Sequence, residues 1–164
     1  MTKAIYLAGP FFNPLQVALL EKIEKICEQA HVSCFSPRKF LVLPPRASWD
    51  VRREVFVDNL KKIEMSDLVF ACLDNPEADG TPRPPDTGTL WEMGYAYAVG
   101  RPVVAFLEEG DRMNVMLAQG CAGFLKSFGD VLKFLGGKYL GKLGGGSEFD
   151  FDWEVAQTWR KDIF

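Results

Sequence analysis

Short runs of apolar residues alternate with amphipathic stretches along most of the chain. Four runs, at 4–8, 31–35, 67–73 and 102–107, are rich in apolar side chains, and a weaker run occupies 121–124. Runs of this length are typical of strands that are buried on both faces of a parallel sheet. The pattern therefore predicts five strands at these positions.

Between the runs, apolar side chains recur at helical spacing. Residues 16–30 place apolar side chains on one face, with glutamates and lysines opposite them. Similar patterns predict helices at 49–64, 87–99 and 127–135, and Gly100 is expected to end the helix at 87–99. In the helix at 49–64, the side chains expected to face inward are Val55, Phe56, Leu60 and Ile63.

Strands that alternate with helices favour a three-layer α/β domain. We expect a flavodoxin-like or Rossmann-like fold, in which a five-stranded parallel sheet carries helices on both faces. The segment 74–86 holds four prolines and one glycine, so it is expected to be a loop. Ligands of such sheets bind beyond the carboxyl ends of the strands, which here are 8–12, 73–86 and 107–114.

Length and charge narrow the class of partner. The chain has 164 residues, enough for one domain, and 19 Lys and Arg against 22 Asp and Glu give a net charge of -3. This balance offers no electrostatic attraction for nucleic acid or for an anionic membrane. We therefore expect the partner to be a small molecule or another protein.

The cysteines and the N-terminal residues bear on metal binding and location. Four isolated cysteines and one histidine are too scattered for a metal site. No apolar run approaches the roughly 18 residues that a membrane-spanning helix needs. The apolar stretch near the N-terminus is too short for the hydrophobic region of a signal peptide. We expect reduced thiols, no metal and a cytoplasmic protein.

The C-terminal part differs in composition from the rest. We expect an α/β domain at 1–135, followed at 136–164 by a glycine-rich hinge and an aromatic tail. Disordered tails rarely carry so many aromatic residues, so this tail is predicted to dock on its own or on a neighbouring subunit. The aromatic residues concerned are Phe149, Phe151, Trp153, Trp159 and Phe164.

The segment 86–96 is the most unusual in the chain. Asp86 stands at the start of a predicted helix, where aspartate ordinarily caps the first turn. Glu92 lies between Trp91 and Met93, an apolar setting in which a carboxylate is costly to bury. Two carboxylates that face one pocket are the minimum equipment for breaking a glycosidic bond with retention. The spacing alone leaves two structural interpretations open: Asp86 as a helix cap without a catalytic role, and Glu92 as a surface glutamate.

Other positions have both functional and structural interpretations. Gly88 permits a tight backbone approach, and Gly94 is expected to allow close packing of its helix on the sheet. Tyr6 is either near the pocket or an ordinary core tyrosine, and Asn114 is either a ligand or a turn residue. Asn59 lies on an apolar helix face, where a polar group needs a partner. The glycines form neither the Gly-x-Gly-x-x-Gly pattern of dinucleotide-binding proteins nor the Walker A pattern of ATP-binding proteins. The sequence therefore does not indicate binding of NAD or ATP.

Four segments resemble the nucleoside 2-deoxyribosyltransferase family, in the family's order. They are Ile5–Phe12, Ser66–Val69, Asp86–Ala96 and Met113–Met116, and the resemblance runs from about Ala4 to about residue 124. The third segment, with the pattern Asp-x-Gly-Thr-x-x-Glu-x-Gly-Tyr-Ala, is the most specific. The resemblance implies transfer of a 2-deoxyribosyl group between purine or pyrimidine bases through a covalent sugar–enzyme intermediate.

The resemblance also implies roles for individual residues. Glu92 is the expected nucleophile at C1′, Asp86 exchanges a proton with the base, and Tyr6 holds Glu92 in line. Phe12 is expected to wall the base pocket, and Asn114 to bind the sugar 5′-hydroxyl in the site of an adjacent subunit. The remaining expected substrate-binding residues are Asn59, Gly88 and Met116.

The resemblance implies a homo-oligomer with active sites at subunit interfaces, nucleoside and free nucleobase as ligands, and no cofactor. Asn59 aligns with an aspartate that touches the base in some members, so base preference is expected to differ from theirs. Two alternatives stay open: a nucleoside 5′-monophosphate N-glycosidase of the same superfamily, and a non-catalytic nucleoside-binding module. The segment Phe11–Pro14 offers little to a phosphate, which favours the free nucleoside.

Overall fold

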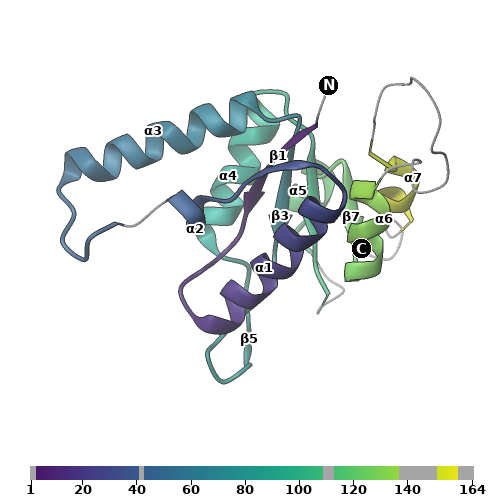
Figure 1. The fold of residues 1–164 in the computed structure, drawn as a ribbon, viewed down its shortest axis with the longest axis horizontal. Helices are drawn as coiled ribbons and strands as arrows, with labels where there is room; N and C mark the ends of the chain where they lie inside the picture. Colours follow the sequence, from purple (N-terminus) through teal and green to yellow (C-terminus); the bar gives the residue numbers. More distant parts are fainter. Residues whose placement is uncertain (1–2, 41–42, 109–112, 137–150, 159–164) are drawn as a thin grey trace.

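A five-stranded parallel sheet forms the centre of the molecule (Figure 1). The computed structural model describes residues 3–40, 43–108, 113–136 and 151–158. The prediction of a flavodoxin-like or Rossmann-like α/β fold is confirmed, and the strand order β2-β1-β3-β6-β7 is the flavodoxin-like one. The strands are β1 (Ala4–Ala8), β2 (Ser33–Phe35), β3 (Leu68–Cys72), β6 (Val103–Phe106) and β7 (Gly123–Leu125).

Helices cover both faces of this sheet, as expected. Side chains of α1 and α6 pack on one face, and side chains of α3, α4 and α5 pack on the other. The short helices α2, α5 and α7 were not predicted, because four to six residues are too few to establish a helical period. The helices are α1 (Pro14–Gln29), α2 (Pro37–Phe40), α3 (Trp49–Met65), α4 (Thr87–Ala98), α5 (Val115–Gly120), α6 (Phe128–Gly136) and α7 (Trp153–Gln157).

The alternation of side chains along β1 decides which layer each residue enters. Ile5 and Leu7 belong to the core beneath α1 and α6, whereas Tyr6 and Ala8 belong to the core beneath α3, α4 and α5. Tyr6 is fully buried there. β1 therefore delivers its one tyrosine to the layer that contains α4.

The strand order reverses direction between β1 and β3. In sheets of this kind the crevice at such a switch point, beyond the carboxyl ends of the strands, is where ligands bind. β1 ends at Ala8 and leads to Phe12, and β3 ends at Cys72 and leads to the segment before α4. The topology thus directs attention to these two segments.

The segment 74–86 is not the plain loop that its prolines suggested. It contains a small antiparallel hairpin of β4 (Asn75–Pro76) and β5 (Pro82–Arg83). The Glu77 N–H donates to the Thr81 carbonyl and the Gly80 N–H donates to the Glu77 carbonyl, which closes the turn. Gly80 takes a φ of 87°, which favours glycine. Two-residue strands that are half proline carry no strand signal, so the prediction was wrong here.

Helix α3 is also less buried than predicted. Of its expected inward residues only Ile63 is buried, while Val55 and Leu60 are half-buried and Phe56 is 46% exposed. Figure 1 shows why: the N-terminal part of α3 extends beyond the sheet. The apolar stripe of this helix therefore exceeds the core that this one chain can offer it.

Three further expectations need comment. The second strand begins at Ser33 rather than at 31, because His31 adopts a φ of 55° in the turn after α1. Gly94 does not allow close packing, since it is exposed and a Cβ there would meet nothing within 4 Å. Gly100 follows α4 with a φ of 74°, which confirms it as the end of that helix.

Part of the C-terminal segment lies against the α/β domain. Phe151 is buried, with its ring centroid 5.1 Å from that of Phe134 in α6, and Ala156 packs closely against Gly123 in β7. Gly136, the expected start of the hinge, lies inside α6. The rest of the expected hinge and the aromatic residues Phe149, Trp159 and Phe164 lie outside the described residues.

Candidate active site

Glu92 of α4 and Tyr6 of β1 meet inside the molecule. The Tyr6 hydroxyl donates a hydrogen bond to Glu92 Oε1 at 2.5 Å. The contact follows from the fold, because β1 sends Tyr6 towards α4 and the helix turns Glu92 towards the sheet together with Met93 and Ala96. The arrangement fixes one carboxylate oxygen.

Burial has a strong effect on both groups. Loss of solvent is the main reason why the pKa of Glu92 rises from its ordinary 4.5 to about 7. The Asp86 carboxylate also raises it, while the hydrogen bond from Tyr6 lowers it. Burial and the neighbouring Glu92 together hold the pKa of the Tyr6 hydroxyl well above its ordinary value, so this hydroxyl keeps its proton and donates. Glu92 is therefore a carboxyl group that changes charge near neutral pH.

Asp86 is the N-cap of α4, as its position in the sequence indicated. Its Oδ2 accepts hydrogen bonds from the Thr89 backbone N–H at 2.9 Å and from the Thr89 hydroxyl at 3.2 Å. Both bonds use the same oxygen, so the cap leaves Oδ1 for another partner. The structural and the chemical interpretations of Asp86 are therefore compatible.

Gly88 supports the conformation of Asp86, and its replacement is an informative test. A Cβ on Gly88 would lie 3.0 Å from Asp86 Oδ2, so the carboxylate must move by a few tenths of an ångström. We expect Gly88→Ala to lower the catalytic rate by about tenfold, since it displaces the Asp86 carboxylate and reacting groups tolerate little displacement. Unfolding should show no loss of stability, because alanine favours a helix over glycine.

Gly94→Ala is the matched control for Gly88→Ala in the same helix. A Cβ at Gly94 would meet no atom within 4 Å. This variant is expected to gain about 0.5–1 kcal/mol of stability and to keep its turnover. Equal turnover in the two variants would contradict the role given to Gly88.

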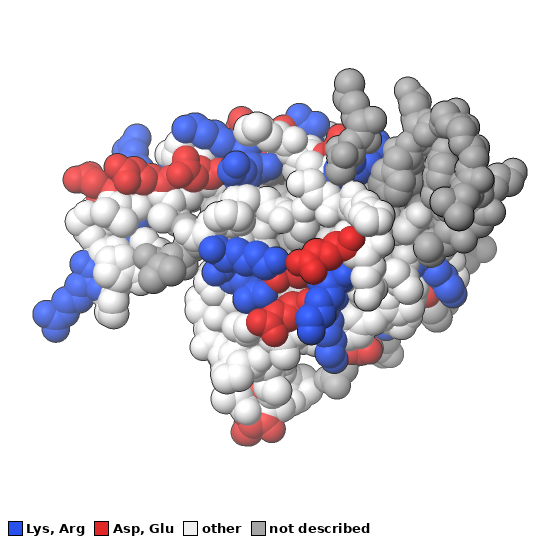
Figure 2. All heavy atoms as spheres, viewed as in Figure 1, with Lys and Arg blue, Asp and Glu red and all other residues white. Residues whose placement is uncertain are grey.

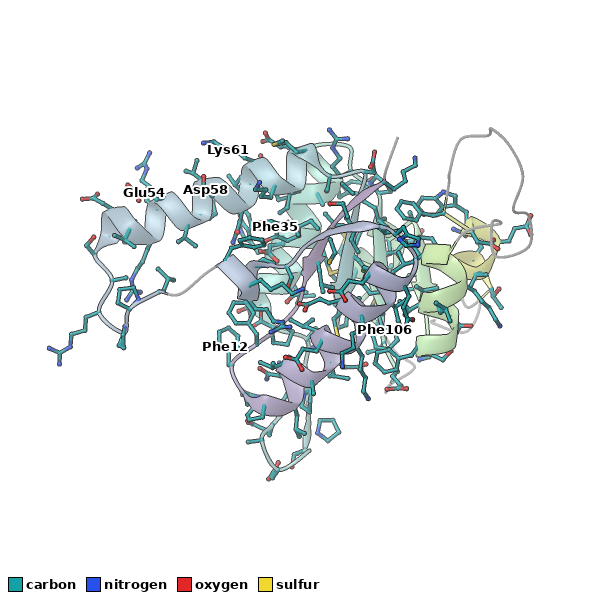
Figure 3. The ribbon with its side chains drawn as sticks, viewed as in Figure 1. Phe12, Phe35, Glu54, Asp58, Lys61 and Phe106 are labelled. Atoms are coloured by element: carbon teal, nitrogen blue, oxygen red, sulfur yellow. The ribbon has the colours of Figure 1, made fainter. Side chains whose placement is uncertain are left out.

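A hollow of about 490 Å³ lies between the segment after β1 and the hairpin. Asp86 and Thr87 line it on one side, and Phe12 lines it on another. The Phe12 side chain is 76% exposed, and Figure 3 shows it at the edge of the molecule. The structure thus brings Phe12 and Asp86 to one hollow, and Asp86 is close enough to Glu92 for their charges to interact.

Gln16 organises this hollow, and the sequence analysis gave it no role. Its Oε1 accepts from the Phe12 backbone N–H at 2.7 Å, and its Nε2 donates to Asn75 Oδ1 at 2.9 Å and to the Pro76 carbonyl at 3.1 Å. The buried amide of Gln16 therefore ties the segment after β1 to the hairpin. A single glutamine in the first turn of an amphipathic helix gives no sequence signal for this role.

Three expected site residues lie apart from the pair. Asn114 is the exposed N-cap of α5, and its Oδ1 accepts from the Met116 backbone N–H at 2.9 Å. Met116 is 77% exposed. Asn59 in α3 has a buried Oδ1 without a hydrogen-bond partner. Within the described parts of the chain, no hydrogen bond joins any of the three to Glu92.

A second, larger hollow of about 910 Å³ shares the hairpin as a wall. Its lining includes leucines of α1, α4 and α5 and the leucines that directly follow β3 and β6, and Asn114 also lines it. Neither Glu92 nor Asp86 lines it. Glu92 lines neither hollow, and we place the candidate chemistry at the smaller one because Asp86 lines it.

The described residues contain no cluster of metal ligands. No three His, Cys, Asp or Glu side chains gather there as a ligand set, and all four cysteines are free thiols. None of the described helices combines the length and the apolar character needed to cross a bilayer. The chemistry at hand is that of the carboxylates and the tyrosine.

A carboxylate beside a second carboxyl group is the equipment of enzymes that transfer glycosyl groups with retention. Comparison with known proteins gives the family. The chain belongs to the nucleoside 2-deoxyribosyltransferase family, whose model matches residues 5–145. Among curated proteins, no significant match is found.

Solved structures agree with this assignment. A 2-deoxyribosyltransferase from the psychrotolerant bacterium Bacillus psychrosaccharolyticus is 32% identical, with a TM-score of 0.70, covering 80% of this chain and 91% of that one. A 2-deoxyribosyltransferase from Leishmania mexicana is 25% identical, with a TM-score of 0.51 and 68% of each chain covered. The CMP N-glycosidase BcmB of Clostridium botulinum shares the fold, at 17% identity, a TM-score of 0.51, and coverage of 79% of this chain and 96% of that one.

Proposed function

We propose that this protein exchanges the base of a 2′-deoxyribonucleoside for another purine or pyrimidine base. The observation that carries the proposal is the half-buried Glu92 carboxyl group of α4, which is held by Tyr6 and is close enough to Asp86 for their charges to interact. Family membership supplies the substrate class. The two together support a deoxyribosyl transfer in which Glu92 carries the sugar.

The chemistry needs two displacements at the anomeric carbon. A Glu92 oxygen attacks C1′, the bond from C1′ to the base nitrogen breaks, and its electron pair leaves with the base. Asp86 gives a proton to that nitrogen. A second base then attacks C1′ while Asp86 takes up its proton, and the ester bond to Glu92 breaks. Two inversions restore the original configuration.

The remaining side chains fit supporting roles. Tyr6 fixes one oxygen of Glu92 in the resting enzyme, and Phe12 offers an exposed ring beside Asp86 on which a base can stack. The Oδ1 of Asn59 is buried without a hydrogen-bond partner and lines neither hollow, so it accepts from an N–H donor of the base once the side chain turns towards the site. An amide both donates and accepts, unlike the carboxylate at this position in some family members.

Asn114 and Met116 act, in this proposal, in the site of a second copy of the chain. Asn114 caps α5 and Met116 lies in it; both are exposed, and no hydrogen bond within the described parts of the chain joins them to Glu92. The long exposed apolar stripe of α3 supports a homo-oligomer independently. Asn114 binds the sugar 5′-hydroxyl across that interface.

The segment after β1 favours a free nucleoside over a nucleoside monophosphate. Phosphate sites of such folds use unoccupied backbone N–H groups at this place. Here the N–H of Phe12 bonds to Gln16, and the N–H groups of Leu15 and Gln16 bond to the Asn13 side chain. These donors are already satisfied within the chain.

A single assay separates the possible activities. Purified protein is incubated with thymidine or deoxyinosine and adenine, and the products are separated by chromatography. Deoxyadenosine that appears only with added adenine is the expected result. Free base released without an acceptor, and faster from a 5′-monophosphate, indicates a hydrolase instead. Binding without turnover indicates a nucleoside-binding module.

The pH dependence of exchange gives a further test. Only ionised Glu92 attacks C1′, and burial, with Asp86 nearby, raises its pKa to about 7. We expect kcat/KM to rise with pH along an acid limb centred near 7. Tyr6→Phe should move this limb to higher pH, because the hydrogen bond that favours the carboxylate is lost. A wild-type limb centred near the ordinary 4.5 contradicts the assignment of Glu92.

A further inference from the structure

Three aromatic rings form a continuous stack that ends at Tyr6. Phe35 of β2 lies beside Tyr6, with ring centroids 5.7 Å apart, and Phe40 of α2 stacks on Phe35 at 5.0 Å with an angle of 6° between the planes. Tyr6 and Phe35 are register partners on neighbouring parallel strands, so both side chains leave the sheet on the same face. The stack thus runs from α2 at the surface to the tyrosine that holds Glu92.

Phe35 is the middle member and is supported from several sides. The Lys62 ammonium of α3 lies 5.2 Å from the centre of its ring. Figure 3 shows Phe35 between α2 and α3. On the other side, Tyr6 pairs in register with Val69 of β3, and the Val69 side chain is fully buried. The Tyr6 ring is therefore confined by Val69 on one strand and Phe35 on the other.

The outer end of the stack is anchored by charge. Arg38 of α2 donates two hydrogen bonds to the buried Glu24 carboxylate of α1, at 2.7 and 2.5 Å, and Lys39 adds an ion pair at 3.1 Å. Burial raises the pKa of Glu24, but the contacts with Arg38 and Lys39 outweigh it and hold the pKa below its ordinary value. Figure 2 shows this group of charged side chains where α1 and α2 meet.

We propose that Phe35 is a positioning residue for this reaction: stacked between Phe40 and Tyr6, it holds the Tyr6 ring so that its hydroxyl stays on Glu92. Phe35 touches no reacting atom in this proposal and acts through Tyr6 alone. The edge strand β2 has only three residues, so packing of the ring, rather than the strand itself, provides the rigidity. The inference rests on the proposed function for its catalytic meaning but not for its geometry.

The proposal makes a specific statement about the ionisation of Glu92. The groups that face Glu92 from the packed elements are Tyr6 on β1 and Asp86 at the start of α4. If Phe35 is replaced by leucine, the Tyr6 ring gains freedom and its hydrogen bond weakens. Because that bond favours the carboxylate, its loss should raise the midpoint of Glu92 titration by about one pH unit. A purely structural role for Phe35 does not move this midpoint.

The experiment is a ¹³C NMR titration of the full chain labelled in its glutamate carboxyl carbons, with the Glu92 signal identified by its absence in Glu92→Gln. Phe35→Leu should raise the Glu92 midpoint by about one unit, and Phe35→Tyr, which keeps the stack, should leave it unchanged. In the double variant that combines Tyr6→Phe with Phe35→Leu, the Glu92 titration midpoint should be the same as in Tyr6→Phe alone. Lys62→Met, which removes only the nearby charge, should not reproduce the effect.

Phe128→Leu is the matched control. Phe128 is also half-buried, packs against another phenylalanine (Phe106, 4.9 Å) and lies beneath a lysine (Lys22, 4.9 Å), but on the α1 and α6 side of the sheet. The Phe128→Leu variant should leave the midpoint of the Glu92 titration unchanged. An unchanged midpoint in Phe35→Leu, or an equal shift in Phe128→Leu, overturns the proposal. The titration does not depend on catalytic turnover. If Phe35→Leu shifts the Glu92 titration but the wild-type protein exchanges no bases, the proposed function is overturned and the positioning role of Phe35 stands.

Discussion

Glu92→Gln is expected to abolish base exchange, with turnover falling by about 10⁴-fold or more. The amide is nearly the same size as the carboxyl group, and its oxygen still accepts a hydrogen bond from Tyr6. It cannot form the covalent bond to C1′, however. Chromatographic assay of the product nucleoside with an excess of donor and acceptor measures the loss directly.

The same variant is expected to be more stable than the wild type above neutral pH. The pKa of Glu92 is raised on folding from 4.5 to about 7, so burial of its charge opposes folding. Below pH 4.5 both states carry the proton and no penalty exists; the penalty grows between the two values and is complete above 7. Glutamine removes it, so the free energy of unfolding should rise by up to about 3 kcal/mol above pH 7.

Glu64→Gln is the control for both effects. Glu64 also accepts a hydrogen bond from a tyrosine hydroxyl, that of Tyr95, but it lies exposed on α3. The same chemical change there should leave exchange and its pH dependence as in the wild type. Substantial exchange by Glu92→Gln, or a comparable loss in Glu64→Gln, contradicts the assignment of Glu92 as nucleophile.

Asp86→Asn is expected to lower base exchange by about 10²–10⁴-fold while the fold keeps its stability. Asparagine caps a helix about as well as aspartate, so its side-chain oxygen can still accept from the Thr89 N–H. It has no proton to exchange with the base. Turnover assays and thermal unfolding on the same preparation separate the two roles.

Two comparisons make the Asp86 test sharper. Asp86→Ala should show the same loss of turnover and, in addition, about 1 kcal/mol less stability, because the cap is gone. A donor whose leaving group departs without a proton should restore release in Asp86→Asn but not in Glu92→Gln. Full exchange by Asp86→Asn shows that Asp86 is a cap and nothing more.

The positions of the main strands and helices along the chain could be predicted because each depends on local pattern. The run 67–73 and the amphipathic stretch 16–30 carry enough apolar periodicity to define β3 and α1 without tertiary information. The three-layer α/β class follows from their alternation, whereas the choice between a flavodoxin-like and a Rossmann-like strand order does not. The cap at Asp86 was predictable for the same reason, since it depends on four consecutive residues.

What the sequence could not predict depends on contacts between distant segments. The hairpin at 75–83 is held by Gln16 and by its own turn, not by strand propensity. The exposure of Phe56 reflects the reach of α3 beyond the sheet. The bond from Tyr6 to Glu92 spans 86 positions in the chain and was expected only from the family resemblance. Spacing within a segment does not contain that information.

Trapping of the sugar on the protein tests the central claim most directly. A 2-fluorinated deoxyribonucleoside analogue slows release of the sugar from the enzyme, and intact-mass spectrometry then reads the adduct. The account predicts a mass increase of one fluorinated sugar, located by peptide mapping on Glu92 and missing in Glu92→Gln. Base release without any adduct, or an adduct on a different residue, would contradict it.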